Sequence, residues 1–175
     1  WESTIRCNLA CAHCRRIEAD DTAPTDLTTP QALELIEQTA ALGRRQGLMP
    51  RLVFSGGEPL CRPDLFELIE AAAARRLKCA LATNGILIDA VMARTIAHAG
   101  LERVAVSLDG ATAAVHNAMR GQDGAFEAAV RGIRHLRDCG VPFQINMTLT
   151  RQNAAQIVAM FAMACEWQAA AIHFF

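Results

Sequence analysis

The fold is decided by residues 78–110, which read KCALATNGILIDAVMARTIAHAGLERVAVSLDG. Two short, mostly apolar runs in this stretch, residues 78–83 and 103–108, have the length of buried strands. Between them, residues 89–99 are expected to form a helix, which Gly100 is suited to end. A strand, a helix and a second strand in this order predict a βαβ unit, in which the two strands run parallel.

The same alternation of strand and helix continues along the whole chain. Thr29 and Pro30 are typical of the N-cap and first turn of a helix, and Asn153 is typical of an N-cap. We expect further strands over residues 1–5, 51–55, 143–150 and 170–175, and further helices over residues 29–47, 62–76, 124–139 and 153–167. Six strands that alternate with helices predict a parallel sheet, either an open doubly wound sheet or an incomplete barrel.

Composition limits the class of protein. The chain has 175 residues, of which 52% are hydrophobic and 20% charged, and this length suits one domain with a buried core. The net charge of -1 argues against a dedicated nucleic-acid binder, and no apolar run approaches the roughly 20 residues of a membrane-spanning helix. Because the chain starts at Trp1 without Met and ends in an apolar strand, we expect one domain over residues 1–175, belonging to a longer polypeptide.

Chemically distinctive residues follow the predicted strands. Function in parallel α/β folds collects at the carboxyl ends of the strands, where the loops from several strands meet. The segments that fall there are Cys7 to Cys14, Gly56-Gly57-Glu58-Pro59, Asn84-Gly85 and Ser107 to Gly110. On the fifth strand Gln144, Asn146 and Thr148 alternate with apolar residues, and a polar face on such a strand indicates a lined cavity.

Cys7, Cys11 and Cys14 place soft thiolates in one loop, which suits a single metal centre. Three kinds of site fit the spacing: a structural zinc site that also uses His13, an electron-carrying cluster with a fourth Cys, and a 4Fe-4S cluster that leaves one iron open. No fourth Cys comes before Cys61, and catalysis requires an open coordination position, yet the triplet alone leaves these alternatives open. We expect the other cysteines to be inert core residues, namely Cys61, Cys79, Cys139 and Cys165.

The ordered set of motifs resembles the radical S-adenosylmethionine (SAM) enzymes. The set consists of Cys-x3-Cys-x2-Cys at 7–14, SGGEP at 55–59, TNG at 83–85, SLDG at 107–110 and HNAMRG at 116–121. Each motif is weak alone, whereas their order over the whole chain is specific. The resemblance implies a partial (β/α)6 TIM-like barrel with parallel strands, truncated here after the sixth strand, and it favours the incomplete barrel over the open sheet.

The resemblance also implies cofactors and a reaction. Members of the family hold a 4Fe-4S cluster and SAM, and the reduced cluster passes one electron to the sulfonium group of SAM. The carbon–sulfur bond then breaks to give methionine and a 5′-deoxyadenosyl radical, which takes a hydrogen atom from the substrate. The same resemblance implies an external one-electron donor of the flavodoxin or ferredoxin type and a cytoplasmic location, without nucleic-acid or membrane partners.

Site residues carry over from the family by motif position. The implied cluster ligands are Cys7, Cys11 and Cys14, and the implied SAM contacts are Gly56, Gly57, Glu58, Ser107, Arg120, His13 and Asn84. The glycine–glutamate segment matches the one that hydrogen-bonds the amino group of SAM, and we see no structural reason for Glu58 to precede Pro59. Arg120 matches an arginine that pairs with the SAM carboxylate, for which a guanidinium is a natural bidentate partner. We expect Asp109 to organise the turn with Gly110 instead.

The motifs also favour a branch of the family. Cys-x-His-Cys-Arg at 11–15 and SLDG at 107–110 resemble the branch shared by tetrapyrrole side-chain modifying enzymes, of haem d1 and alternative haem synthesis, and by SPASM-type peptide-maturing enzymes. The Cys-x-His-Cys-Arg form favours the tetrapyrrole enzymes and thus a small-molecule substrate. A peptide substrate is the alternative, and molybdopterin precursor synthesis is a further one. A non-catalytic iron–sulfur electron carrier or zinc-binding module is the alternative of another class, and it leaves Glu58 and its glycines unexplained.

Overall fold

The computed structural model describes residues 1–14 and 26–175, so Arg15 of the Cys-x-His-Cys-Arg motif lies outside the described residues. The strands are β1 (Glu2–Thr4), β2 (Arg51–Gly56), β3 (Lys78–Thr83), β4 (Leu101–Ser107), β5 (Phe143–Met147) and β6 (Ala171–Phe174). The helices are α1 (Thr29–Gln46), α2 (Leu65–Ala74), α3 (Ala90–His98), α4 (Ala113–Arg120), α5 (Ala125–Asp138) and α6 (Ile157–Glu166). Two short 3-10 turns, η1 (Pro59–Cys61) and η2 (Ala154–Gln156), complete the elements.

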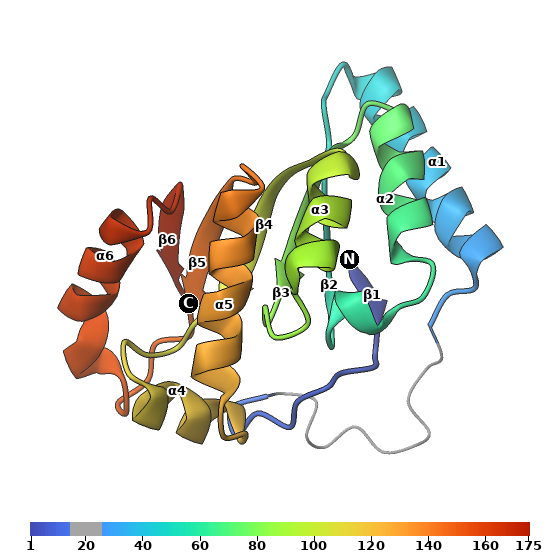
Figure 1. The fold of residues 1–175 in the computed structure, drawn as a ribbon. Helices are drawn as coiled ribbons and strands as arrows, with labels where there is room; N and C mark the ends of the chain where they lie inside the picture. The colour runs from blue at the N-terminus through green and yellow to red at the C-terminus, as the bar shows by residue number, and fades with distance from the viewer. Residues whose placement is uncertain (15–25) are drawn as a thin grey trace.

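The strands form one parallel six-stranded sheet whose order is the order of the chain, from β1 to β6. Helices α1, α2, α3, α5 and α6 lie along one side of this sheet, while α4 lies at the end where the strands finish (Figure 1). A doubly wound sheet would carry helices on both faces. The arrangement confirms the predicted fold class, a partial TIM-like barrel with parallel strands.

Local sequence explains where the first helices begin and end. In α1 the N-cap is Thr28, one residue before the predicted Thr29, and the side chain of Gln31 accepts a hydrogen bond from the Thr28 backbone N–H at 2.9 Å. Gly47 ends this helix in the left-handed conformation, as predicted. At the start of α3 the Asp89 carboxylate accepts hydrogen bonds from the backbone N–H groups of Val91 and Met92, so Asp89 is the N-cap of the helix predicted to begin there.

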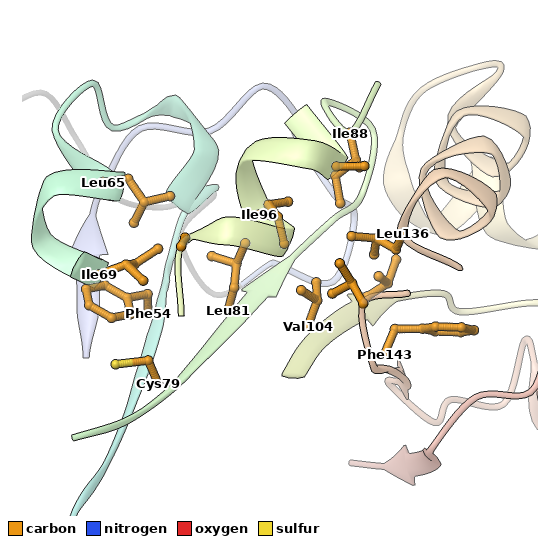
Figure 2. Close-up of a cluster of buried hydrophobic side chains, with 14 of the residues drawn as sticks. Phe54, Leu65, Ile69, Cys79, Leu81, Ile88, Ile96, Val104, Leu136 and Phe143 are labelled. Carbon is orange, nitrogen blue, oxygen red and sulfur yellow. The ribbon is translucent and has the colours of Figure 1, made fainter. Parts of the chain in front are cut away.

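The hydrophobic core lies between the sheet and the helices. Phe54, Leu81 and Val104 point from β2, β3 and β4 toward the helices, where Ile69 and Leu136 meet them (Figure 2). All of these side chains are fully buried. Burial of apolar area on this face holds the helices on one side of the sheet.

The opposite face of the sheet carries small and polar side chains. Ala82, Ala105 and Gln144 are register partners in one row across β3, β4 and β5. Successive side chains of a strand point to opposite faces, so this row faces away from the helices. The alanines leave space in front of the sheet. Among the described residues, no helix combines the length and hydropathy needed to cross a bilayer.

Helix α4 was not predicted. Residues 116–120 of this helix belong to the HNAMRG motif, which was expected only as a family landmark, although Gly121 is a typical helix end. Gly121 adopts a φ of +67°, and a Cβ there would lie 2.6 Å from the carbonyl oxygen of Ala10. The end of α4 therefore packs directly against the loop that carries the cysteines.

The fifth strand is shorter than predicted, and Asn153 does not cap a helix through its side chain. The backbone N–H of Thr148 donates to Asp109 Oδ1 at 2.9 Å, so the chain leaves the sheet after Met147. The Asn153 amide instead donates to the carbonyl oxygens of Asp109 and Thr148 at 2.9 and 2.8 Å. The Asn153 side-chain oxygen, which would accept a capping bond, accepts from the Thr150 backbone N–H at 2.7 Å, so the turn that follows has no side-chain cap.

Candidate active site

A cavity of about 540 Å³ opens at the carboxyl ends of the strands. It collects residues from the loop after β1, from the turns after β2 and β3, from the ends of β4 and β5, and from α4. Its lining includes Cys7, Cys11, His13, Cys14, Gly56, Gly57, Thr83, Asn84, Ser107, Arg120, Asn146, Thr148 and Phe175. The cavity predicted from the polar face of the fifth strand is therefore present, and Asn146 and Thr148 contribute to its wall.

The cysteine loop (residues 7–14) is held by its own backbone and by α4. The backbone N–H of Ala12 donates to the carbonyl oxygen of Met119 at 3.0 Å, and that of Cys14 donates to Cys11 at 3.0 Å. Cys11 is buried, and burial raises the pKa of its thiol, while the neighbouring Arg120 guanidinium opposes the rise. Cys7 is exposed and Cys14 half-buried, so the three thiols lie at different depths along one wall.

The donor set fits a three-thiolate iron–sulfur site. All three thiols line one cavity, and soft sulfur ligands of this kind select iron–sulfur clusters or zinc. Within the described part of the chain, no three His, Cys, Asp or Glu side chains stand close enough together to form a finished metal site. The thiolate ligands of a cluster bind different iron atoms and need not meet around one ion, so the three thiols of this wall could hold a 4Fe-4S cluster.

Two of the other cysteines, Cys61 and Cys165, do not belong to the core as the sequence predicts. Cys79 is fully buried in the core, and Cys139 is half-buried against it. Cys165, by contrast, is exposed, because it lies on the outer face of α6. Cys61 is half-buried in η1, where burial, and then the charges of Glu58 and Cys7, raise the pKa of its thiol.

The glycine turn after β2 is fastened to the segment that leads into the cysteine loop. Gly56 has a φ of +133°, and a Cβ there would lie 2.3 Å from the carbonyl oxygen of Thr4. The backbone N–H groups of Gly57 and Glu58 donate to the carbonyl oxygens of Thr4 and Arg6 at 2.8 and 2.7 Å. Only glycine at position 56 allows this approach, and the two hydrogen bonds hold the turn beside the segment that leads into the cysteine loop.

Glu58 differs from its neighbours, because its carboxylate is fully buried and does not reach the described lining of the cavity. The carboxylate accepts hydrogen bonds from Thr83 Oγ1 and from the backbone N–H groups of Leu60 and Asn84. Burial raises the pKa of Glu58, and these three hydrogen bonds oppose the rise. Contrary to the expectation from the sequence, Glu58 has a structural reason to stand before Pro59.

Asp109 and Arg120 form a buried ion pair behind the cysteine loop. Arg120 Nη2 lies 2.7 Å from Asp109 Oδ2, and Arg120 Nη1 lies 3.8 Å from Cys11 Sγ. His13 Nε2 is 3.6 Å from the same carboxylate oxygen. The sequence predicted only that Asp109 organises a turn with Gly110. In the structure Asp109 also links the ends of β4 and β5 to α4 and the cysteine loop.

The ion pair leaves hydrogen-bonding capacity unused. Arg120 Nε and Asp109 Oδ2 are buried and make no hydrogen bond with any described residue, although the two groups are in ion-pair contact. A buried N–H without an acceptor is costly. Because Arg120 also lines the cavity, its guanidinium group fits an anionic group of a bound cofactor, such as a carboxylate.

Asn8 and His173, for which the sequence predicts no role, are bonded to residues of the predicted site. Asn84 Nδ2 donates to Asn8 Oδ1 at 2.7 Å, so the third strand also holds the cysteine loop. On the face of the sheet that is turned away from the helices, called the inner face below, Gln144 Nε2 donates to Asn146 Oδ1 at 2.8 Å. The same Nε2 lies 3.2 Å from His173 Nδ1. The sequence could have pointed to Asn8 only through its position beside Cys7.

His116 is a buried neutral histidine next to the ion pair of Asp109 and Arg120. The backbone N–H of Asp109 donates to His116 Nδ1 at 3.0 Å, so the ring carries its hydrogen on Nε2. Burial, followed by the charges of Arg120 and His13, lowers the pKa of His116 from 6.5 to about 3. The ring therefore stays neutral in the folded protein over the physiological range of pH.

We expect His116 to make stability depend on pH. Its folded pKa lies below its unfolded pKa, so its full contribution is present above pH 6.5. Stability should then fall by about 1.4 kcal/mol per unit as the pH drops from 6.5 toward 3. Urea unfolding at pH 7 and pH 5 should show a loss of about 2 kcal/mol that His116→Asn largely removes. The exposed His98→Asn is the control and should keep the wild-type slope; equal slopes in all three proteins would contradict the prediction.

A curved parallel sheet with a thiol-lined cavity at its carboxyl ends defines the class of barrel enzymes that hold a metal cofactor at that end. The profile of the Radical SAM superfamily matches residues 1–164, and the chain belongs to this superfamily. The superfamily uses a 4Fe-4S cluster and SAM, so this chain belongs to a family of enzymes that depend on both.

Curated relatives cover all or nearly all of this chain. It is 41% identical over 175 residues to the AdoMet-dependent heme synthase of Methanosarcina barkeri, covering 100% of this chain and 49% of the relative. It is 40% identical over 157 residues to the pre-heme d1 synthase of Dinoroseobacter shibae, with coverages of 90% and 37%. It is 36% identical over 170 residues to the mycofactocin maturase MftC of Mycobacterium tuberculosis, with coverages of 97% and 42%. The chain thus spans half or less of the length of these relatives.

Solved structures support the fold. The enzyme anSMEcpe with bound AdoMet superposes with a TM-score of 0.80 at 22% identity, covering 99% of this chain and 49% of that one. Identity at this level speaks for the fold alone. The partial barrel therefore recurs in a protein that was crystallised with AdoMet.

Proposed function

We propose that this chain is the radical SAM core domain of a longer enzyme that modifies the side chains of a tetrapyrrole. One observation carries the proposal: three thiols, a glycine turn and an arginine with an unused N–H meet in one cavity. The cluster would be held by Cys7, Cys11 and Cys14. The tetrapyrrole substrate is supported by the similarity to an AdoMet-dependent heme synthase and a pre-heme d1 synthase.

The protein's contribution is binding and orientation. When bound, the cluster and SAM supply the electron and the deoxyadenosyl radical. Gly56 and Gly57 would approach the amino group of SAM with their backbone, because no side chain intervenes. Arg120 would direct its guanidinium group at the carboxylate of SAM, and Ser107 would bind near the same group. His13 and Asn84 line the cavity and would contact the nucleoside.

The substrate would lie against the inner face of the sheet. Asn146 belongs to the cavity wall and is hydrogen-bonded to Gln144, which in turn accepts from Arg103 Nη1 at 3.1 Å. The polar row therefore continues from the cavity along β5 toward β4. We expect an external one-electron donor of the flavodoxin or ferredoxin type and, because thiolate ligands need a reducing compartment, a cytoplasmic location.

Peptide maturation is the second candidate, because the chain is also 36% identical to a mycofactocin maturase. Anaerobic reconstitution of the full-length protein separates the two. We expect about four iron atoms per chain and formation of 5′-deoxyadenosine when reductant and SAM are added. An iron tetrapyrrole with carboxylate side chains should increase the formation of 5′-deoxyadenosine, and the tetrapyrrole itself should change in mass. If only peptide substrates increase the formation of 5′-deoxyadenosine, the second candidate is favoured. Tightly held zinc, or a cluster that does not cleave SAM, would overturn both.

A further inference from the structure

Glu58 is held by protein groups on both of its carboxylate oxygens. Oε1 accepts hydrogen bonds from Thr83 Oγ1 at 2.8 Å and from the Leu60 backbone N–H at 3.1 Å. Oε2 accepts from the Asn84 backbone N–H at 2.7 Å. Three donors at these distances occupy most of the acceptor positions of a carboxylate. The side chain is fully buried, so little remains for a ligand in the cavity.

The same residue reaches the cysteine loop from both sides of Cys7. Its backbone N–H donates to the carbonyl oxygen of Arg6 at 2.7 Å. Through its carboxylate it holds Asn84, whose side-chain amide donates to Asn8 Oδ1 at 2.7 Å. Glu58 therefore fixes the residue before Cys7 and, by way of Asn84, the residue after it.

We propose that Glu58 is a positioning residue, whose carboxylate joins the end of β3 to the glycine turn and, through Asn84, orients the cysteine loop. It acts on the cofactors only through these neighbours, while the backbone of the glycine turn makes the direct contact. The proposal deepens the proposed function and rests on it for the role of the cysteine loop. The link from Glu58 to Asn8 can be tested without any cofactor.

Glu58→Gln is the sharpest test, because it removes an acceptor and keeps the shape. The amide of Gln has one oxygen and one NH2 group, and an NH2 group cannot accept a hydrogen bond. In one orientation the NH2 group faces the Asn84 N–H, and in the other it faces the Leu60 N–H and the Thr83 hydroxyl. Either way, at least one backbone N–H that bonds to the carboxylate loses its acceptor.

Hydrogen–deuterium exchange of the full-length, cluster-free protein measures this effect. We expect Glu58→Gln to speed exchange about tenfold or more at the Asn84 amide and in the peptide that contains the cysteine loop. Asn8→Ala breaks only the last link, so it should speed exchange in the cysteine loop and leave Asn84 protected. The matched control is Glu70→Gln, the same chemical change at an exposed position of α2, which should leave both peptides unchanged.

Reconstituted enzyme supplies a second readout. Both Glu58→Gln and Asn8→Ala should raise the KM for SAM by about tenfold and change kcat by less than about threefold, because both misplace a wall of the binding site. If Glu58→Gln weakens SAM binding but leaves hydrogen–deuterium exchange at Asn84 unchanged, Glu58 is a direct ligand of SAM and the proposal is wrong. If the wild-type enzyme does not cleave SAM, the proposed function is wrong. The exchange experiment would still test the positioning role of Glu58, because it uses the cluster-free protein.

A milder variant covers the case in which Glu58→Gln does not fold. Thr83→Val keeps the shape of the side chain and removes the hydroxyl that donates to Glu58 Oε1. We expect exchange at Asn84 to speed in the same direction by a smaller factor, about threefold. Wild-type exchange at Asn84 in Thr83→Val would overturn the proposal as well.

Discussion

Cys11→Ala should remove the iron–sulfur cluster and abolish SAM cleavage. Cys11 is the most deeply buried of the three thiols that line the cavity, with 7% of its surface exposed. Two thiolates cannot replace three as ligands of an open cluster, and a buried Ala offers no donor. Iron content after anaerobic reconstitution should fall from about four atoms per chain to near zero, and 5′-deoxyadenosine should be undetectable.

Cys139→Ala is the matched control for this experiment. Cys139 lies at the C-terminal end of α5 and packs against the core, away from the described lining of the cavity. The substitution removes one sulfur atom, as Cys11→Ala does, so iron content and SAM cleavage should stay at the wild-type level. Loss of the cluster in Cys139→Ala with retention in Cys11→Ala would show that the cysteine loop is not the cluster site.

Asp109→Asn should lower the free energy of unfolding by about 3 kcal/mol, because it leaves the buried Arg120 charge without its partner. Asn still accepts the hydrogen bond from the Thr148 N–H, so the loss reports the charge and not the turn. Urea unfolding of the cluster-free protein measures it. The double variant Asp109→Asn/Arg120→Met should recover much of the loss, and together with Arg120→Met alone it should give a coupling energy of about 2 kcal/mol or more.

An exposed carboxylate serves as the control for the buried one. Glu102 pairs with Arg51 at 3.1 Å and with Lys78 at 3.5 Å, and the three side chains are 39% to 49% exposed. Glu102→Gln should therefore change the free energy of unfolding by less than about 0.5 kcal/mol, since solvent screens such pairs. Similar losses in Glu102→Gln and Asp109→Asn would mean that burial does not strengthen the Asp109 pair.

Local patterns explain why most of the fold was predictable. The run from Lys78 to Thr83 is apolar and short, and Asp89 meets the requirements of an N-cap, so β3 and the start of α3 were predicted correctly. Helix α4 was missed because it is short and directly follows a functional motif. Asn153 stands directly before η2 and α6, as predicted, but its side chain bonds to Thr150, Asp109 and Thr148 and does not cap them. Contacts that come from distant segments leave no periodic signal in the sequence.

The sequence by itself determined the parallel architecture, the family and the residues that gather at the carboxyl ends of the strands, because spacing and strand polarity are local properties. Tertiary structure alone decided which of those residues line the cavity and which hold its walls together. It turned Glu58 away from the cavity, paired Asp109 with Arg120, and brought α4 under the cysteine loop. Buried polar groups must find partners, and folding supplies those partners from segments that lie far apart in the chain.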